Sequence, residues 1–229
     1  MDKIKIHFNK YRMGYTMGGG MVGWFILLLL MATVGQKPPY NSTALQVGSF
    51  SIAWYAVFIL TGITFGAILA FYEIKFIGIN KDDLYDGLLF AVPLAIVGAR
   101  LYYVIFDPAN TYESLGDIFD IAGGGLAIHG AVITTIIFLI FFTRFKKMNI
   151  WKVFDIIAPG FLIGQIMGRW GNFFNQEAHG GPTTRAFLKN KLHLPNFIVE
   201  NMNKAGVYYH PTFLYEGLWN SLGLIIILV

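Results

Sequence analysis

The chain has 229 residues, of which 55% are hydrophobic and only 13% are charged, whereas a soluble domain carries about a quarter charged residues. This composition excludes an ordinary soluble globular protein and a disordered one. The chain has no cysteine, which excludes disulfides, thiolate nucleophiles and zinc–thiolate sites, and its formal charge of +4 is too small to indicate a nucleic-acid partner.

Six stretches with few charged residues are long enough to be membrane-spanning helices, because a bilayer core needs about 20 apolar residues. In chain order they cover residues 13–36, 50–72, 84–106, 121–142, 154–175 and 213–229. We therefore predict an all-α fold, a polytopic helical membrane protein with about six spans and an outer-side helical or loop segment at 176–210. The first stretch follows a basic arm, and its poor cleavage site favours a retained membrane anchor over a signal peptide.

Lysine and arginine are distributed unevenly over the predicted connections. The N-terminal arm and the loop after 121–142 hold four each and the loop after 50–72 holds two, whereas the short loops on the other side hold Lys37 alone. The positive-inside rule then places the N-terminus and the basic loops in the cytoplasm. We expect a multi-pass protein whose segment 176–210 lies outside.

The ionisable residues within the spans gather in the outer half of the predicted bundle. Arg100 lies one to two turns from the outer end of its span, His129 about 12 Å along the next, and Arg169 near the outer end of 154–175. Because such residues are costly in a membrane, this one-sided cluster predicts a polar pocket open to the outer leaflet. Neighbouring segments add Tyr55, Asn172, Asn175, Glu177, His210, Tyr215 and Glu216.

The span 154–175 has two distinct faces. Glycines recur every four residues at positions 160, 164 and 168, which indicates close packing against another helix. Another face carries polar residues at spacings of four, three and four, which either point into a site or form an interhelical hydrogen-bond ladder. These are Gln165, Arg169, Asn172 and Gln176.

This set of residue types suits a phosphate-bearing ligand. Arg100 and Arg169 match phosphate oxygens, and in the outer leaflet the obvious phosphate is that of an anionic phospholipid headgroup. His129 is the candidate base, because a histidine titrates near neutral pH, and Glu177 and Glu216 can orient it or pair an arginine. The glycines at 123–125 allow either a flexible loop or the close approach of a ligand. No spacing typical of a metal site is present, so we predict no metal.

Three motifs make the chain resemble the prolipoprotein diacylglyceryl transferase family of bacteria. They are GGLAIHG at 124–130, GRWGNFFNQEAHG at 168–180 and HPTFLYEGLWN at 210–220. On this resemblance, residues 50–229 form a transferase-like transmembrane domain and residues 1–49 a basic arm, an extra anchor and an outer loop. The family ends with one more, arginine-bearing span, so the resemblance implies that the chain is C-terminally incomplete.

The resemblance also implies a reaction. The diacylglyceryl group passes from phosphatidylglycerol to the lipobox cysteine thiol of a prolipoprotein signal peptide, and glycerol phosphate is released, the first step of lipoprotein maturation in the bacterial inner membrane. Neither a metal nor an organic cofactor is required. Catalysis is assigned to His129, Arg169 and Glu177. Substrate binding is assigned to Tyr55, Arg100, Arg169, Asn172, Asn175, Gly180 and Glu216.

A transporter of outer-leaflet anionic lipids or anions is the alternative, because outward-facing arginines suit it as well. Such a transporter needs a polar path to the inner side and often internal repeats. The sequence has no evident repeat, and the predicted inner halves lack polar residues.

Overall fold

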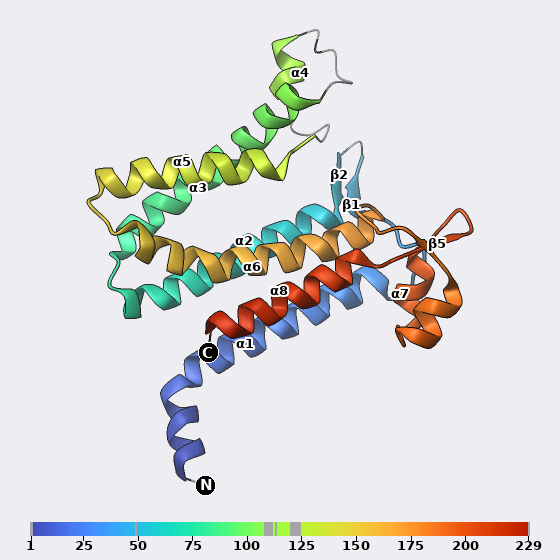
Figure 1. The fold of residues 1–229 in the computed structure, drawn as a ribbon, viewed down its shortest axis with the longest axis horizontal. Coiled ribbons are helices and arrows are strands. Elements are labelled where there is room, and N and C mark those ends of the chain that lie inside the picture. The colour runs from blue at the N-terminus through green and yellow to red at the C-terminus, as the bar shows by residue number, and fades with distance from the viewer. Residues whose placement is uncertain (1, 49, 108–111, 113, 120–124, 229) are drawn as a thin grey trace. The chain divides into compact units, whose positions relative to one another are not determined.

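The computed structural model describes residues 2–48, 50–107, 112, 114–119 and 125–228, with side chains described from Met13 on except at residue 115 (Figure 1). The long helices are α1 (Asp2–Thr33), α2 (Trp54–Ile77), α3 (Lys81–Phe106), α5 (Ile128–Phe145), α6 (Ile150–Asn175) and α8 (Thr212–Leu228). In this part of the chain, five helices are long and apolar enough to cross a membrane, and α8 is a shorter apolar helix of 17 residues. The predicted polytopic helical membrane protein is confirmed.

Two small sheets add to the helical fold and were not predicted. Strands β1 (Thr43–Val47) and β2 (Phe50–Ala53) form an antiparallel hairpin that leads into α2. The segment between α6 and α8 contains a three-stranded antiparallel sheet. Its central strand β5 (Val207–Tyr209) pairs with β3 (Pro182–Thr183) on one side and with β4 (Asn203–Lys204) on the other. The short helices α4 (Leu115–Phe119), η1 (Phe187–Lys191) and α7 (Asn196–Asn201) complete the chain.

The observed helices differ from the predicted spans mainly at their ends. The second span was predicted from Phe50, but residues 50–53 are strand and α2 begins at Trp54. The fourth was predicted from residue 121, whereas α5 begins at Ile128, and residues 120–124 lie outside the described part. At other ends the helices run past the first charged residue, as α2 does to Ile77, because a helix continues into the polar interface where hydropathy falls.

The chain forms two compact units, residues 1–66 with 159–229 and residues 67–158. In the first unit, glycines bring α2 and α6 into close contact. A Cβ added at Gly66 would lie 3.2 Å from the Gly160 Cα, and one added at Gly62 would lie 3.2 Å from the Gly164 Cα. The prediction that the glycines of span 154–175 serve helix packing is confirmed.

Aromatic rings fill the interior of the first unit. Phe58 of α2 stacks on Phe174 of α6 at 5.4 Å between ring centroids, and neither side chain is exposed. Trp170 of α6 contacts Phe25 of α1 at 5.3 Å and Phe213 of α8 at 5.2 Å. These rings hold four helices together around the end of α6 that carries the polar motif.

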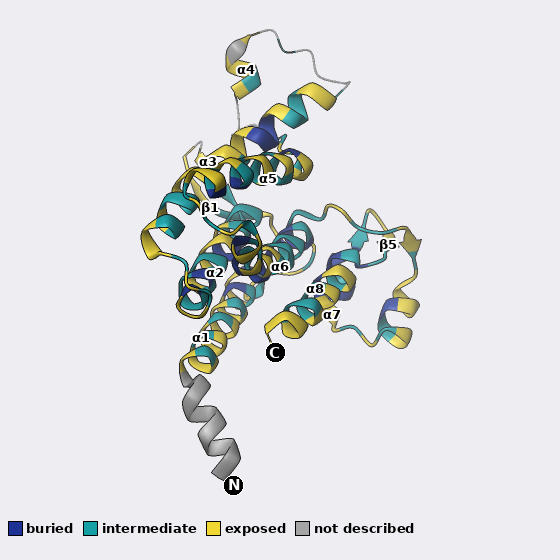
Figure 2. Cartoon of the chain, turned by 60° about the vertical axis from the view of Figure 1, so that its left-hand side comes forward, coloured by how far each residue is buried: buried dark blue, intermediate teal, exposed yellow. Residues whose placement is uncertain are grey.

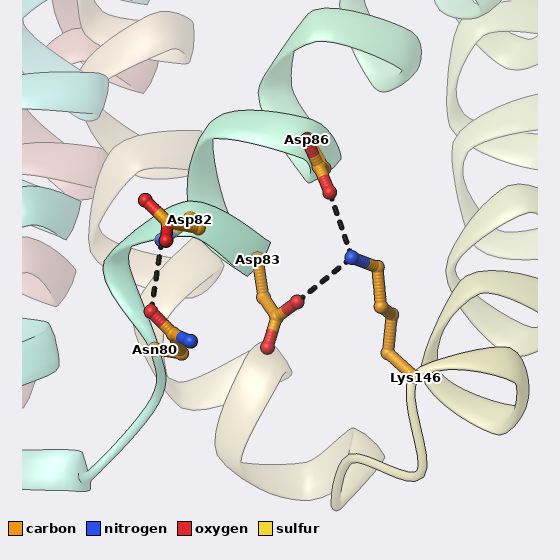
Figure 3. Close-up of polar contacts among 5 residues, drawn as sticks. All are labelled: Asn80, Asp82, Asp83, Asp86 and Lys146. Atoms are coloured by element: carbon orange, nitrogen blue, oxygen red, sulfur yellow. Dashed lines mark hydrogen bonds and ion pairs between the residues drawn. The ribbon is translucent and has the colours of Figure 1, made fainter.

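In the second unit, α3 and α5 form a hairpin fastened at both ends. Near one end, a Cβ added at Gly130 would lie 2.8 Å from the Gly98 carbonyl carbon, so the two backbones touch. At the other end, Lys146 Nζ lies 2.9 Å from an Asp83 oxygen and 2.7 Å from an Asp86 oxygen (Figure 3). The crossing and the ion pairs fix the register of the hairpin.

Figure 2 shows exposed residues along the helices, and many of them are large and apolar. On α3 and α5, Leu89 is 67% exposed, Ile105 70% and Phe141 67%. Surfaces this apolar are unfavourable in water, whereas in a bilayer they contact acyl chains. The exposure pattern therefore agrees with the hydropathy of the spans.

Candidate functional site

The candidate site of the first unit begins on the last two turns of α6. Arg169, Asn172 and Asn175 follow one another at intervals of three residues, which places them along one side of the helix. The helix ends at Asn175, and Glu177 then turns back towards it. The Glu177 N–H donates to the Asn172 carbonyl at 3.1 Å.

Glu177 is held by side chains as well as by backbone. Its Oε1 accepts hydrogen bonds from Asn172 Nδ2 at 3.1 Å and from Asn175 Nδ2 at 3.3 Å. Its neighbours Gln176 and Ala178 have φ values of 53° and 50°, in the left-handed region that side chains other than glycine rarely adopt. Strained backbone of this kind is concentrated at functional sites, where the surrounding structure holds it in place.

An ion pair links α6 to the first turns of α8. Arg169 Nη2 contacts Glu216 Oε2, and the two side chains are 31% and 48% exposed. Because both charges remain accessible, an anionic ligand can approach the guanidinium without unfolding the helix ends. A guanidinium binds two oxygens of a phosphate at once, as it does those of a carboxylate, so a phosphate can take the place of the carboxylate partner.

Tyr55 joins this group because α6 has a glycine opposite its ring. A Cβ at Gly171 would lie 2.7 Å from Tyr55 Cδ2 and 3.2 Å from its Cα. The hydroxyl is close enough to interact electrostatically with both Glu177 and Arg169. Gly171 thus leaves room for the Tyr55 ring at the site, a role that no sequence pattern indicated.

Gly180 lies where the segment after α6 meets the entrance to α8. Its N–H donates to the His210 carbonyl at 2.9 Å, and the His210 N–H donates to the Gly181 carbonyl at 3.0 Å. A Cβ at Gly180 would lie 2.9 Å from the His210 Cβ and 3.0 Å from Thr212 Cγ2. The glycine therefore permits the backbone pairing that joins the second and third motifs.

Arg100, in the second unit, donates hydrogen bonds to backbone carbonyls and lies over the rings of Tyr103 and Tyr112, at 5.8 and 5.9 Å from their centroids. Its side chain is buried, and its guanidinium donates to the carbonyls of Asp117 at 2.6 Å, Ile118 at 2.7 Å and Gly125 at 3.2 Å. These bonds hold the chain between α3 and α5. Of the three glycines expected before His129, only Gly125 lies among the described residues; its φ is 73°.

His129 lies at a different depth from the one expected. The sequence placed it about 12 Å along its span, but it is the second residue of α5 and its side chain is exposed. The extended backbone at Ala127, directly before α5, explains the difference, because it does not continue a helix. Among the described residues its ring contacts Tyr102, at 5.9 Å between centroids.

Of the nine predicted site residues, the structure brings six together in the first unit, places Gly180 in the same unit against His210, and leaves two, Arg100 and His129, in the second. The six are Tyr55, Arg169, Asn172, Asn175, Glu177 and Glu216. The predicted polar face of α6 is wrong at its last position. Gln176 leaves the helix with a positive φ, and its amide donates to Asn201 Oδ1 at 3.2 Å.

Asn201 is the main residue that sequence reasoning missed. Its side chain is fully buried, accepts from the Tyr40 N–H at 2.9 Å and donates to the Phe173 carbonyl at 2.9 Å. An asparagine in a short polar segment gives no signal of burial. Within the described residues, no three histidine, aspartate or glutamate side chains are grouped so that they could hold a metal ion.

Comparison with known proteins gives one consistent result. A family model described as prolipoprotein diacylglyceryl transferase matches residues 42–229. The phosphatidylglycerol–prolipoprotein diacylglyceryl transferase of Listeria innocua is 47% identical over 191 residues, which are 83% of this chain and 69% of that relative. The protein of the same name from Bacillus mycoides is 49% identical over 195 residues, 85% of this chain and 72% of that relative.

Proposed function

Because the chain belongs to the prolipoprotein diacylglyceryl transferase family, we propose that it carries out the family's reaction at the cluster around Arg169. The protein transfers a diacylglyceryl group from phosphatidylglycerol to a prolipoprotein. The observation that carries the assignment of the site is the half-exposed Arg169–Glu216 pair beside a Glu177 held by two amides. The transporter alternative is not favoured, since the family and the relatives are transferases.

The acceptor in this proposal is the lipobox cysteine of the prolipoprotein. This chain has no cysteine, so the reacting thiol comes with the substrate. The thiolate attacks the carbon of the diacylglyceryl group that is bonded to the phosphate oxygen. A C–S bond forms at this carbon, and its C–O bond to the phosphate breaks. Glycerol phosphate leaves with the bonding electron pair, and the thiol proton goes to a base.

Arg169 is assigned to the phosphate. Negative charge grows on the phosphate as it leaves, and a guanidinium aimed at those oxygens stabilises the transition state more than the ground state. Glu216 holds Arg169 in place until the lipid arrives. Glu177 and Asn172 are assigned to the glycerol hydroxyls of the headgroup. Asn175 Oδ1 is buried and accepts no hydrogen bond from the described residues, which makes it a further acceptor for such a hydroxyl.

His129 is assigned to the thiol proton and Arg100 to the loop. The exposed imidazole on the first turn of α5 is accessible to a substrate, and a neutral imidazole accepts a proton near neutral pH. Arg100, bound to three carbonyls, positions the segment before His129. Tyr55 and Gly180 shape the site.

We further propose the location of the protein as the bacterial inner membrane, with the N-terminus in the cytoplasm and the Arg169 cluster towards the outer leaflet. The excess of lysine and arginine in one set of loops supports this orientation. We also propose the domain boundaries. The family match from residue 42 supports a transferase domain near 50–229 and a separate N-terminal arm and anchor.

The test is transfer of labelled diacylglyceryl from phosphatidylglycerol to a lipobox peptide in membranes. Arg169→Gln is expected to lower the rate about 10²- to 10³-fold, the usual cost of losing one group that stabilises transition-state charge. Arg185→Gln is the matched control, because Arg185 also pairs with a glutamate, Glu200, in the same unit. Equal rates for the Arg169 variant and the wild type would remove Arg169 from the site.

The role of His129 is tested by substitution. His129→Gln is expected to lower the rate about 10²- to 10⁴-fold, because a glutamine side chain cannot take up the thiol proton. A variant that keeps the wild-type rate at every pH would show that His129 is not the base.

A further inference from the structure

A cavity of about 490 Å³ lies in the second unit, at the turn between the two spanning helices α2 and α3. It is lined by Phe71, Ile74, Lys75, Ile79, Lys81 and Tyr85. Because α2 ends at Ile77 and α3 begins at Lys81, the cavity lies where the spans leave the apolar core, at the depth of lipid headgroups. None of its lining residues belongs to the proposed transfer site.

The cavity combines two kinds of surface. Its floor is apolar, since Ile74 is buried and packs with Ala70 and Ile156, and Phe71 and Ile79 cover them. The rings of Phe71 and Tyr85 contact each other at 4.5 Å between centroids. A ligand with both a polar head and an apolar body fits such a surface.

The polar side of the cavity is positively charged, because its lining contains two lysines and no carboxylate. Lys75 and Lys81 are exposed, and neither forms an ion pair with a described carboxylate. The nearby aspartates Asp83 and Asp86 are both held by Lys146. Each lysine instead lies over an aromatic ring, at 5.9 Å from Tyr72 for Lys75 and 5.4 Å from Tyr85 for Lys81.

We propose that this cavity binds the phosphate-bearing headgroup of an anionic phospholipid in the leaflet on this side of the membrane. The two ammonium groups neutralise the phosphate, as basic residues at a membrane surface do for anionic lipids. The tyrosine hydroxyl and the aromatic rings lie at the interface, and the first carbons of the lipid cover the apolar floor. The bound lipid anchors the turn between α2 and α3.

The experiment uses the full chain purified in detergent, without prolipoprotein, and a phosphatidic acid that carries a photoreactive diazirine near its headgroup. The yield of cross-links within residues 71–85 is measured by mass spectrometry. Competition by unlabelled phosphatidic acid is expected to abolish these cross-links, whereas phosphatidylcholine and soluble sn-glycerol 3-phosphate are expected to compete at least tenfold less well. Equal competition by phosphatidylcholine would refute the requirement for an anionic headgroup. Equal competition by glycerol phosphate would refute the requirement for a lipid, because glycerol phosphate has no acyl chains.

Variants connect the cross-links to the cavity. Lys75→Gln with Lys81→Gln is expected to weaken binding about tenfold or more, since each lysine contributes to attraction of an anionic lipid. Arg144→Gln with Lys147→Gln is the control, because both residues are exposed and flank Lys146 at the C-terminal end of α5. Equal losses in the two double variants would overturn the site in favour of a general basic surface.

A third variant keeps both lysines and fills the space. Ile79→Trp is expected to lower the cross-link yield severalfold, and an unchanged yield would show that the cavity is not occupied. Cross-links elsewhere in the chain serve as the internal reference for folding. The yield does not depend on transfer, so a protein inactive in the transferase assay but cross-linked at 71–85 would contradict the proposed function alone.

Discussion

At the scale of single residues, one buried amide joins three parts of the first unit. Asn201 bonds the backbone of Tyr40 and of Phe173, and it accepts from Gln176 just before Glu177. The side chain therefore fixes where α6 ends and how the strained turn around Glu177 begins. Asn201 affects the site by positioning it, because its partner Gln176 directly precedes Glu177, which contacts substrate in our proposal.

Asn201→Ala is expected to destabilise the protein by about 1–3 kcal/mol, because it leaves the Tyr40 N–H without its acceptor, whereas the Phe173 carbonyl still accepts from the Gln176 N–H at 3.3 Å. The measurement is the thermal unfolding midpoint in detergent. Asn190→Ala, at an exposed position of the same segment, is the control and is expected to change stability by less than about 0.5 kcal/mol. Similar midpoints for both variants would contradict the role of Asn201.

A second residue-scale prediction concerns acid. The hydrogen bond from Arg185 is the main cause that lowers the pKa of Glu200 below its ordinary value of 4.5, and the Tyr208 hydroxyl adds to it. A lowered folded-state pKa stabilises the fold above the unfolded pKa, and this contribution is lost as the pH falls through the folded value. As the pH is lowered from about 7 to about 3, the thermal unfolding midpoint of the wild type is therefore expected to fall more steeply than that of the Glu200→Gln variant. Parallel curves would refute the coupling.

At the scale of elements, glycines decide how closely the helices pack. The crossing of α3 and α5 at Gly98 and Gly130 also sets the two candidate residues beside them, Arg100 and His129. The extended Ala127 runs along α3, where its N–H donates to the Ala99 carbonyl at 3.0 Å. Separation of the helices would therefore shift both candidate residues, although neither glycine contacts a ligand in our proposal.

Gly98→Ala is expected to destabilise the hairpin by about 1–3 kcal/mol, because its Cβ would lie 2.5 Å from the Thr134 Cβ and 2.9 Å from the Gly130 carbonyl oxygen. Gly87→Ala on the same helix is the matched control, since its Cβ would meet Phe142 at an ordinary 3.5 Å. That change is expected to be neutral or to stabilise by up to about 1 kcal/mol through helix propensity. Equal unfolding midpoints in the two variants would exclude a tight crossing.

At the scale of the whole molecule, the few charged residues are concentrated near particular ends of the spans. Lysine and arginine dominate the N-terminal arm and the connections after α2 and α5, whereas the Arg169 cluster lies at the opposite end of α6. This sorting supports the proposed orientation, with the basic ends in the cytoplasm and the site towards the outer leaflet.

The orientation can be tested directly, because the chain has no cysteine and any labelled thiol is an introduced one. Lys147→Cys is expected to react with an impermeant maleimide only after the cells are permeabilised, whereas Asn190→Cys is expected to react in intact cells. Both positions are exposed. The reverse pattern would overturn the proposed topology, and the cysteine-free parent provides the blank.

The sequence by itself determined the membrane class, the order of the spans, the close packing of the glycine face of α6 against another helix and the motifs of the candidate site. These follow from local properties, because hydropathy over about 20 residues and a glycine every four residues are read along the chain. It did not predict the two small sheets, since strands of two to five residues depend on partners distant in sequence.

Only the tertiary structure decided which polar groups are bound to one another. It pairs Arg169 with Glu216, ties Arg100 to carbonyls of the loop before α5, and turns Gln176 away from its expected face towards Asn201. The physical reason is that a hydrogen bond depends on distance and angle between groups that lie far apart in the sequence, whereas a sequence pattern reports only the face of a helix on which a residue lies.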